Sequence, residues 1–196
     1  MLGLDRAFEL TSVVPLGAFV LIHVGRYASV LFGAETVGAR RSPSVAFLVV
    51  EALVVWAPLA FHALYAPSVW RRRRATETGA PSGLLVLHRL SVLPLALFLV
   101  DHFVRFRLPI LQGQTYPADS VQRLAAELSA TRGGVPWVAA LALAGVLAAA
   151  FHTSFGLYRV AARRRSDSLG LRVACSAVGV LVGVSGVVTV VRLAAG

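Results

Sequence analysis

Long apolar runs, separated by short stretches rich in arginine, glycine and proline, dominate the pattern of this chain. Each run has about the 20 residues that an α-helix needs to cross the hydrocarbon core of a bilayer. The pattern predicts five membrane-spanning helices, at about residues 11–32, 44–66, 83–106, 135–158 and 169–193. We therefore expect an all-α integral membrane protein, with one helical bundle formed by residues 1–196.

Two segments need separate treatment. The first apolar run is longer than the core of a usual signal peptide, so we assign it as a helix of the mature protein. In the longest connection, Asp119-Ser120-Val121-Gln122 resembles a capping box, and apolar residues follow at helical spacing until Gly133 and Gly134. This connection predicts a short amphipathic helix on the outer membrane surface.

Composition supports the membrane class. The chain is 57% hydrophobic and only 14% charged, with a mean hydropathy of +0.75. The net charge of +10 comes from arginine, since no lysine is present. The arginines are spread over short loops, which disfavours a nucleic-acid partner. Those at 71–74 and 163–165 predict cytoplasmic loops and a cytoplasmic N-terminus. The single cysteine, Cys175, excludes a disulfide framework, and the absence of a C-x-x-C-H motif excludes covalent haem attachment.

Four histidines lie in four consecutive predicted spans: His23, His62, His102 and His152. An ionisable residue inside a membrane span is costly, which makes each a candidate for function. With alternating span directions, His23 and His102 fall near the outer surface, and His62 and His152 near the inner surface. Two histidines at one depth on facing helices can ligate a haem iron from both sides. The pattern thus predicts two bis-histidine b haems in a four-helix core.

Other readings of these histidines stay open. A lone intramembrane histidine is about as often a partner in an interhelical hydrogen bond. A non-haem metal is less favoured, because Asp101 is the only carboxylate beside a matched histidine. His88 also falls at the inner depth and could replace His62 or His152 as a ligand. We expect it instead to donate to a haem propionate, with Arg26, Arg89 and Arg105 as cationic propionate partners.

Order and spacing give this chain a family resemblance. The segments GAFVLIHVGRY (residues 17–27), Phe61-His62-Ala63, His88-Arg89-Leu90-Ser91 before Asp101-His102, and Phe151-His152-Thr153 carry it. Together with a histidine-free fifth span, they resemble the single-chain, di-haem cytochrome b subunit of succinate dehydrogenase or fumarate reductase. The resemblance covers essentially the whole chain, although each local motif is short.

The resemblance implies a role in a larger complex of the bacterial cytoplasmic membrane. Such an anchor holds a flavoprotein subunit and an iron–sulfur subunit on its cytoplasmic face, and it passes their electrons through two haems to a quinone, usually menaquinone. Glu35 and Glu51 are the candidate proton carriers for quinone chemistry. Glu35 could equally be a solvated loop carboxylate, and Glu51, inside the second span, could instead have an arginine partner. Some fumarate reductases carry a glutamate where this chain has Ala150, which argues against a proton pathway of that kind.

Two rival functions remain. A cytochrome b of a membrane hydrogenase or formate dehydrogenase often places two ligands on one helix. Here His88 and His102 share a span, but they lie about 21 Å apart along a helix, at different depths. The second rival is a haem-free transporter or structural membrane protein, which an absorbance spectrum distinguishes.

Overall fold

The computed structural model describes residues 2–11, 15, 17–18, 44–76, 82–113, 120–164 and 168–195. Over these ranges the chain is helical, and its only β-type pairing is an isolated bridge between Arg132 and Val135. Four of its helical stretches are long and apolar enough to cross a membrane, at Val45–Arg72, Gly83–Phe106, Trp137–Arg163 and Leu169–Ala195. They confirm the second to fifth predicted spans. The first predicted span lies almost entirely outside the described residues.

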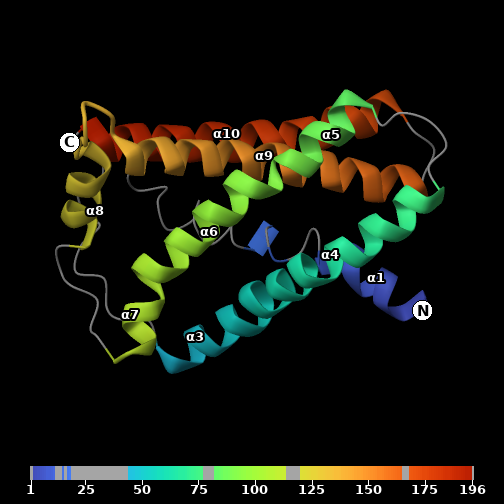
Figure 1. Ribbon diagram of the computed structural model, residues 1–196, viewed down its shortest axis with the longest axis horizontal. Coiled ribbons are helices and arrows are strands. Elements are labelled where there is room, and N and C mark those ends of the chain that lie inside the picture. The colour runs from blue at the N-terminus through green and yellow to red at the C-terminus, as the bar shows by residue number, and fades with distance from the viewer. Residues whose placement is uncertain are drawn as a thin grey trace.

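The best-packed part of the fold is a pair of long antiparallel helices, α9 (Trp137–Arg164) and α10 (Leu169–Ala195) (Figure 1). They approach closely because small residues face each other: a Cβ added at Gly179 would lie 2.8 Å from Ser154 Cβ. Helix α6 (Val92–Phe106) crosses α9 in the same way, with Phe98 filling the space beside Gly145. Glycines at such crossings let membrane helices gain contact between their backbones.

The second span is one continuous helical stretch of three parts. It begins with α3 (Val45–Glu51), continues through a π-helical turn, η1 (Ala52–Trp56), and ends with α4 (Ala57–Thr76). The expectation that it ends near Pro67 is wrong, because α4 runs on to Thr76. A proline removes one backbone N–H, and membrane helices absorb that loss by local adjustment. A hydrogen bond of 3.1 Å from Arg72 to the Tyr65 hydroxyl bridges the proline.

The third span is divided into two helices, α5 (Gly83–Leu90) and α6. Ser82 caps α5 by accepting a hydrogen bond from the backbone N–H of Leu85. The division falls at Ser91, three residues before Pro94, whose missing N–H interrupts the helical ladder there. A single turn, α7 (Leu108–Leu111), follows α6 after Arg107.

Two shorter helices complete the described structure. Helix α8 (Ser120–Ser129) confirms the predicted amphipathic helix, and Gly133 and Gly134 follow it with φ of +60° and +78°. Its buried Leu128 packs against Ala139 and Leu193, so its apolar face covers one end of the α9–α10 pair. Helix α1 (Leu2–Thr11), which the sequence analysis did not predict, packs on α4.

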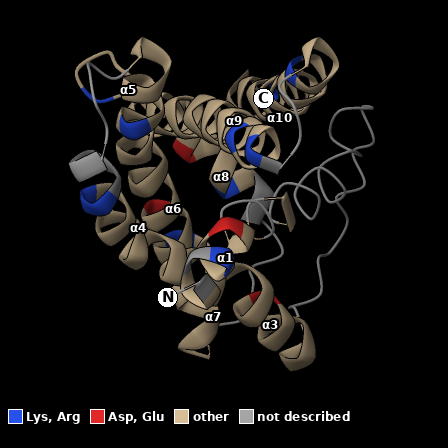
Figure 2. Ribbon diagram, turned by 90° about the vertical axis from the view of Figure 1, so that its right-hand side faces the viewer, with Lys and Arg blue, Asp and Glu red and all other residues tan. Residues whose placement is uncertain are grey.

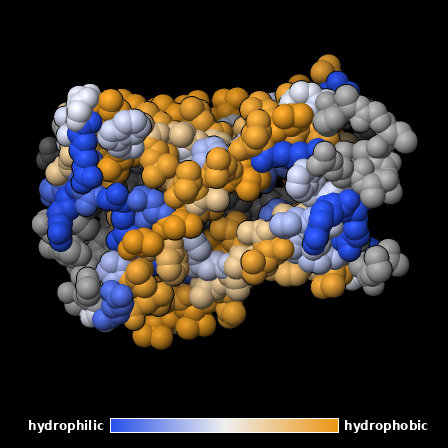
Figure 3. All heavy atoms as spheres, in the orientation of Figure 1, coloured by the Kyte–Doolittle hydropathy of each residue, from blue (hydrophilic) through white to orange (hydrophobic). Residues whose placement is uncertain are grey.

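The surface has the polarity of a membrane protein. Apolar side chains form a band across the middle of the face in Figure 3, with charged residues towards both ends. Large apolar side chains such as Leu64, Leu93 and Leu181 are exposed, as lipid-facing positions require. Basic residues lie near the ends of α4 and α9 (Figure 2). This end contains Arg71, Arg72 and Arg163 and corresponds to the arginine-rich face that the sequence analysis predicted to be cytoplasmic.

Candidate functional site

Three of the five histidines lie near one another in the described structure. His88 on α5 and His152 on α9 stack face to face, with ring centroids 4.2 Å apart and planes at 10°. His62 on α4 is near enough to interact electrostatically with both. We refer to His62, His88 and His152 as the histidine cluster. His62 and His152 lie well inside their helices, because α4 and α9 run on past the expected ends of the spans, and the depth of the cluster in a membrane stays a prediction.

His152 is restrained by a hydroxyl as well as by the stack. Its Nδ1 lies 3.1 Å from Ser91 Oγ, and Ser91 is buried at the division between α5 and α6. The Ser91 hydroxyl also donates to the backbone carbonyl of His88, over 2.8 Å. Ser91 thereby connects the two histidines of the stack.

His62 is covered on one ring face by Phe8 of α1. The two ring centroids lie 4.3 Å apart and the planes are 7° from parallel. Nδ1 of His62 is buried without a hydrogen-bond partner, as is Nε2 of His88. Stacking occupies a ring face and not the in-plane lone pair, through which an imidazole nitrogen binds a metal.

His102 lies towards the other end of the third span, between the rings of Phe98 and Phe106 at centroid distances of 5.9 Å and 4.8 Å. Its predicted partner His23 lies outside the described residues, as do Arg26 and Glu35. The pairing of His23 with His102 therefore stays a prediction.

The two remaining cationic candidates already have partners. Arg105 binds Asp101 at 2.7 Å and also pairs with Glu127 on α8. Arg89 lies over the ring of Trp70 on α4, with its guanidinium carbon 5.8 Å from the ring centroid. Arg89 is near the histidine cluster in sequence and in space, and Arg105 is near His102.

Glu51 forms a buried ion pair near the far end of the second span. Its Oε1 accepts a hydrogen bond from Arg107 Nε at 2.9 Å and lies 2.8 Å from Arg107 Nη2. An intramembrane glutamate predicts a proton route or an arginine partner, and Arg107 is that partner. The pair joins α3 to the corner between α6 and α7.

The π-helical turn brings a second contact into register with this ion pair. Trp56 meets the ring of Phe103 edge-on, with centroids 5.0 Å apart. Trp56 follows Glu51 by five residues, whereas Phe103 precedes Arg107 by four. A π turn takes one residue more than an α turn, so the two pairs can form on successive turns. The indole Nε1 of Trp56 is buried without a hydrogen-bond partner.

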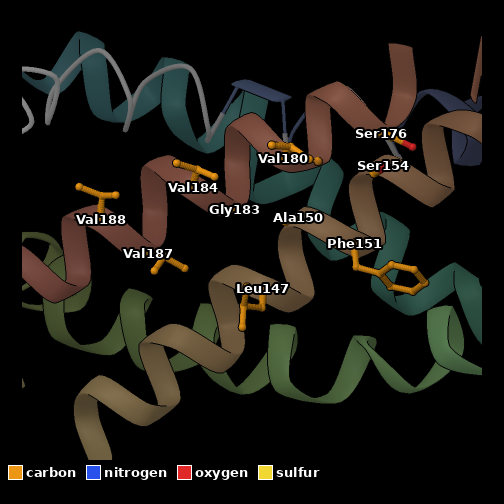
Figure 4. Close-up of a pocket in the computed structure, with 11 residues that line it drawn as sticks. Leu147, Ala150, Phe151, Ser154, Ser176, Val180, Gly183, Val184, Val187 and Val188 are labelled. Carbon is orange, nitrogen blue, oxygen red and sulfur yellow. The ribbon is translucent and has the colours of Figure 1, made fainter. Parts of the chain in front are cut away.

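A groove of about 510 Å³ lies between α9 and α10 (Figure 4). Leu147, Ala150 and Phe151 line it from α9, and a row of valines lines it from α10. Its polar side chains are the hydroxyls of Ser154 and Ser176, and Ser154 already donates to the Cys175 carbonyl at 2.8 Å. The groove can hold an apolar chain, but it offers no acid, base or metal ligand.

The described part of the chain contains no group of three or more His, Cys, Asp or Glu side chains placed to hold a metal ion. A haem iron has a smaller requirement, because the porphyrin supplies four nitrogens and the protein supplies one or two axial ligands. His62 and His152 each supply an imidazole whose ring face is covered by an aromatic neighbour, on helices α4 and α9.

Three residues of these sites were missed by sequence reasoning. Ser91 was quoted only as part of a motif, although a serine three residues after a histidine in an apolar span is a usable signal. Phe8 belongs to a helix that was not predicted. Arg107 carries no local signal, because its partner Glu51 lies 56 positions before it in the sequence.

Comparison with models of protein families, with curated proteins and with solved structures found no match for this chain.

Proposed function

We propose that this chain is the membrane-anchor cytochrome b subunit of a succinate dehydrogenase or fumarate reductase, passing electrons between an iron–sulfur subunit and a membrane quinone through two bis-histidine b haems. The observation that carries the proposal is the histidine cluster. It brings His88 of the third span into contact with His152 of the fourth, with His62 of the second span nearby, inside an apolar bundle where ionisable groups are rare.

In this proposal His62 and His152 hold one haem iron. Two observations support this pairing. His62 and His152 are near enough to interact electrostatically, and each has one ring face covered by an aromatic ring. Bound haem supplies reversible one-electron chemistry, and the protein supplies ligation, orientation and exclusion of water.

The second haem would be held by His102 and His23. His102 lies in an aromatic environment, about 21 Å from His88 along an ideal helix, so a haem held there would lie at a different level from the histidine cluster. Its partner residue rests on the sequence pattern alone.

The propionates of these haems need cationic partners. Arg89 suits the histidine cluster, because a guanidinium over an indole ring can still donate hydrogen bonds in its own plane. Arg105 would have to exchange one of its two carboxylate partners for a propionate. His88 is the other donor candidate at the first site, since its Nε2 lacks a partner.

The dicarboxylate chemistry would reside in a flavoprotein subunit and an iron–sulfur subunit. The basic end formed by α4 and α9 is the candidate docking face, and the same arginines predict that it is cytoplasmic in a bacterial membrane. For the quinone, usually menaquinone in this family, Glu35 stays the candidate proton carrier. Glu51 is less suited, because Arg107 holds it as a buried ion pair.

A redox titration of the purified full-length chain tests the proposal. The reduced-minus-oxidised spectrum should show a sharp α band, two haems per chain and two midpoint potentials. His62→Ala and His152→Ala should each remove the same transition, and His102→Ala should remove the other. Ser154→Ala on α9 is the matched control and should keep both.

The outcomes separate the rival readings. A chain that folds and carries no haem refutes the proposal and favours a haem-free membrane protein. If His88→Ala removes a transition and His152→Ala removes none, His88 is the ligand and His152 its neighbour in the stack.

A further inference from the structure

Ser91 has one hydroxyl proton and two polar neighbours. Its Oγ lies 2.8 Å from the carbonyl oxygen of His88 and 3.1 Å from Nδ1 of His152. The direction of these two hydrogen bonds fixes which nitrogen of His152 carries a proton.

The shorter contact joins two oxygens, and a carbonyl oxygen can only accept. Two oxygens at 2.8 Å in a buried site need a hydrogen between them, so the Ser91 hydroxyl donates to His88. Ser91 Oγ then has only lone pairs left for its second neighbour. His152 must therefore donate from Nδ1, and in the neutral ring Nε2 becomes the acceptor.

We propose that Ser91 is a positioning residue that holds His152 as the tautomer protonated at Nδ1, so that the Nε2 lone pair is the one presented for ligation. The ligation part rests on the proposed function. The tautomer itself is a property of the haem-free chain.

One further contact restrains the same ring. His88 covers one face of His152, with the ring centroids 4.2 Å apart. A hydrogen bond on one edge and a ring on one face together set the plane of the imidazole. Metal-binding histidines commonly receive this kind of support through the nitrogen that does not bind the metal.

The first experiment measures the tautomer in the haem-free, full-length chain. The chain is labelled with ¹⁵N-histidine, placed in lipid nanodiscs, and the ring nitrogen shifts of His152 are assigned by their loss in His152→Ala. We expect a protonated Nδ1 and an unprotonated Nε2. Ser91→Ala should convert a large fraction to the opposite tautomer, whereas Ser91→Thr, which keeps a hydroxyl, should not.

Ser154→Ala is the matched control, because this serine lies on α9 and donates to a backbone carbonyl without contacting a histidine. It should leave the His152 shifts unchanged. Finding Nε2 protonated in the wild-type chain overturns the inference without any variant having to fold. An unchanged tautomer in a folded Ser91→Ala chain overturns it too.

The second experiment uses the haem-loaded chain. Losing the donor–acceptor contact makes the ligand less basic, so Ser91→Ala should raise one of the two midpoint potentials and weaken retention of that haem by about 10- to 100-fold. Ser91→Thr and Ser154→Ala should do neither. A chain with the expected tautomer but no haem refutes the proposed function and leaves the Ser91 assignment standing. A chain with two haems and the opposite tautomer supports the proposed function and refutes the Ser91 assignment.

Discussion

The ion pair between Glu51 and Arg107 should be among the strongest single contributors to the stability of this bundle. Both side chains are almost fully buried, with exposed fractions of 4% for Glu51 and 8% for Arg107. One carboxylate oxygen, Oε1, accepts a hydrogen bond from Arg107 Nε at 2.9 Å and lies 2.8 Å from Nη2. Glu51→Ala would therefore leave a buried positive charge without its partner.

Removing one member of such a buried pair costs about 3–5 kcal/mol, because the charge left behind has lost its solvation and its partner. At about 1.4 kcal/mol for each factor of ten, this corresponds to at least a 100-fold fall in the folding equilibrium constant. Arg107→Ala should cost a similar amount. The double variant should cost well below the sum, since it leaves neither charge unpaired.

The assay is reversible unfolding in mixed micelles, with the free energy of unfolding measured for the two single variants and the double variant. The pair of Asp101 and Arg105 is the matched control, because its side chains are 30% and 34% exposed. An exposed pair four residues apart contributes about 0.3–0.5 kcal/mol. If the Glu51 and Arg107 losses simply add, or match those of the control pair, the reasoning from burial is wrong.

Two further substitutions probe helix packing. Gly145→Ala would place a methyl group inside the volume of the Phe98 side chain, so it should lower the free energy of unfolding by about 1–3 kcal/mol. Gly183→Ala is the control: its new Cβ would lie 3.4 Å from Ala150 Cβ, so it should be neutral in the same unfolding assay. Equal losses would show that the α6–α9 crossing is loosely packed. Trp56→Phe keeps an aromatic ring against Phe103 and removes the buried indole N–H that lacks a partner, so the free energy of unfolding should stay the same or rise. Trp56→Ala removes the ring as well and should lower it by about 3–5 kcal/mol. A loss on Trp56→Phe as large as that on Trp56→Ala would mean that the N–H has a stabilising partner.

Hydropathy predicted the long helices of the fold well. A segment that crosses hydrocarbon must be helical to satisfy its backbone hydrogen bonds, and its side chains must be apolar, so each span is one long apolar run in the sequence. The second to fifth spans begin within about two residues of their expected positions. The errors lie at the ends of the helices, where apolarity gives no information. Helix α4 continues past Pro67, and α9 extends to Arg164. Long arginine side chains allow this, because they can reach the surface from a continuing helix.

The grouping of the histidines was predictable, but their contacts were not. Helical rise predicted His62, His88 and His152 at one level, and the structure stacks His88 on His152 with His62 nearby. The partners of these residues depend on helix rotation and on residues far away in sequence. Phe8 lies 54 positions before His62, and Ser91 lies 61 before His152, so no local pattern links them.

The π-helical turn has a consequence for how the second span is used. Glu51 and His62 are eleven residues apart, which in an uninterrupted α-helix would align them to within about 20°. The additional residue in the turn, seen in the bond from the Ala57 N–H to the Ala52 carbonyl, offsets them by about one residue's rotation, or roughly 100°. The second span thus directs the Glu51 carboxylate to the α6–α7 corner and the His62 imidazole to a different set of neighbours, including Phe8. Substitutions around Glu51 can therefore leave the neighbours of His62 unchanged.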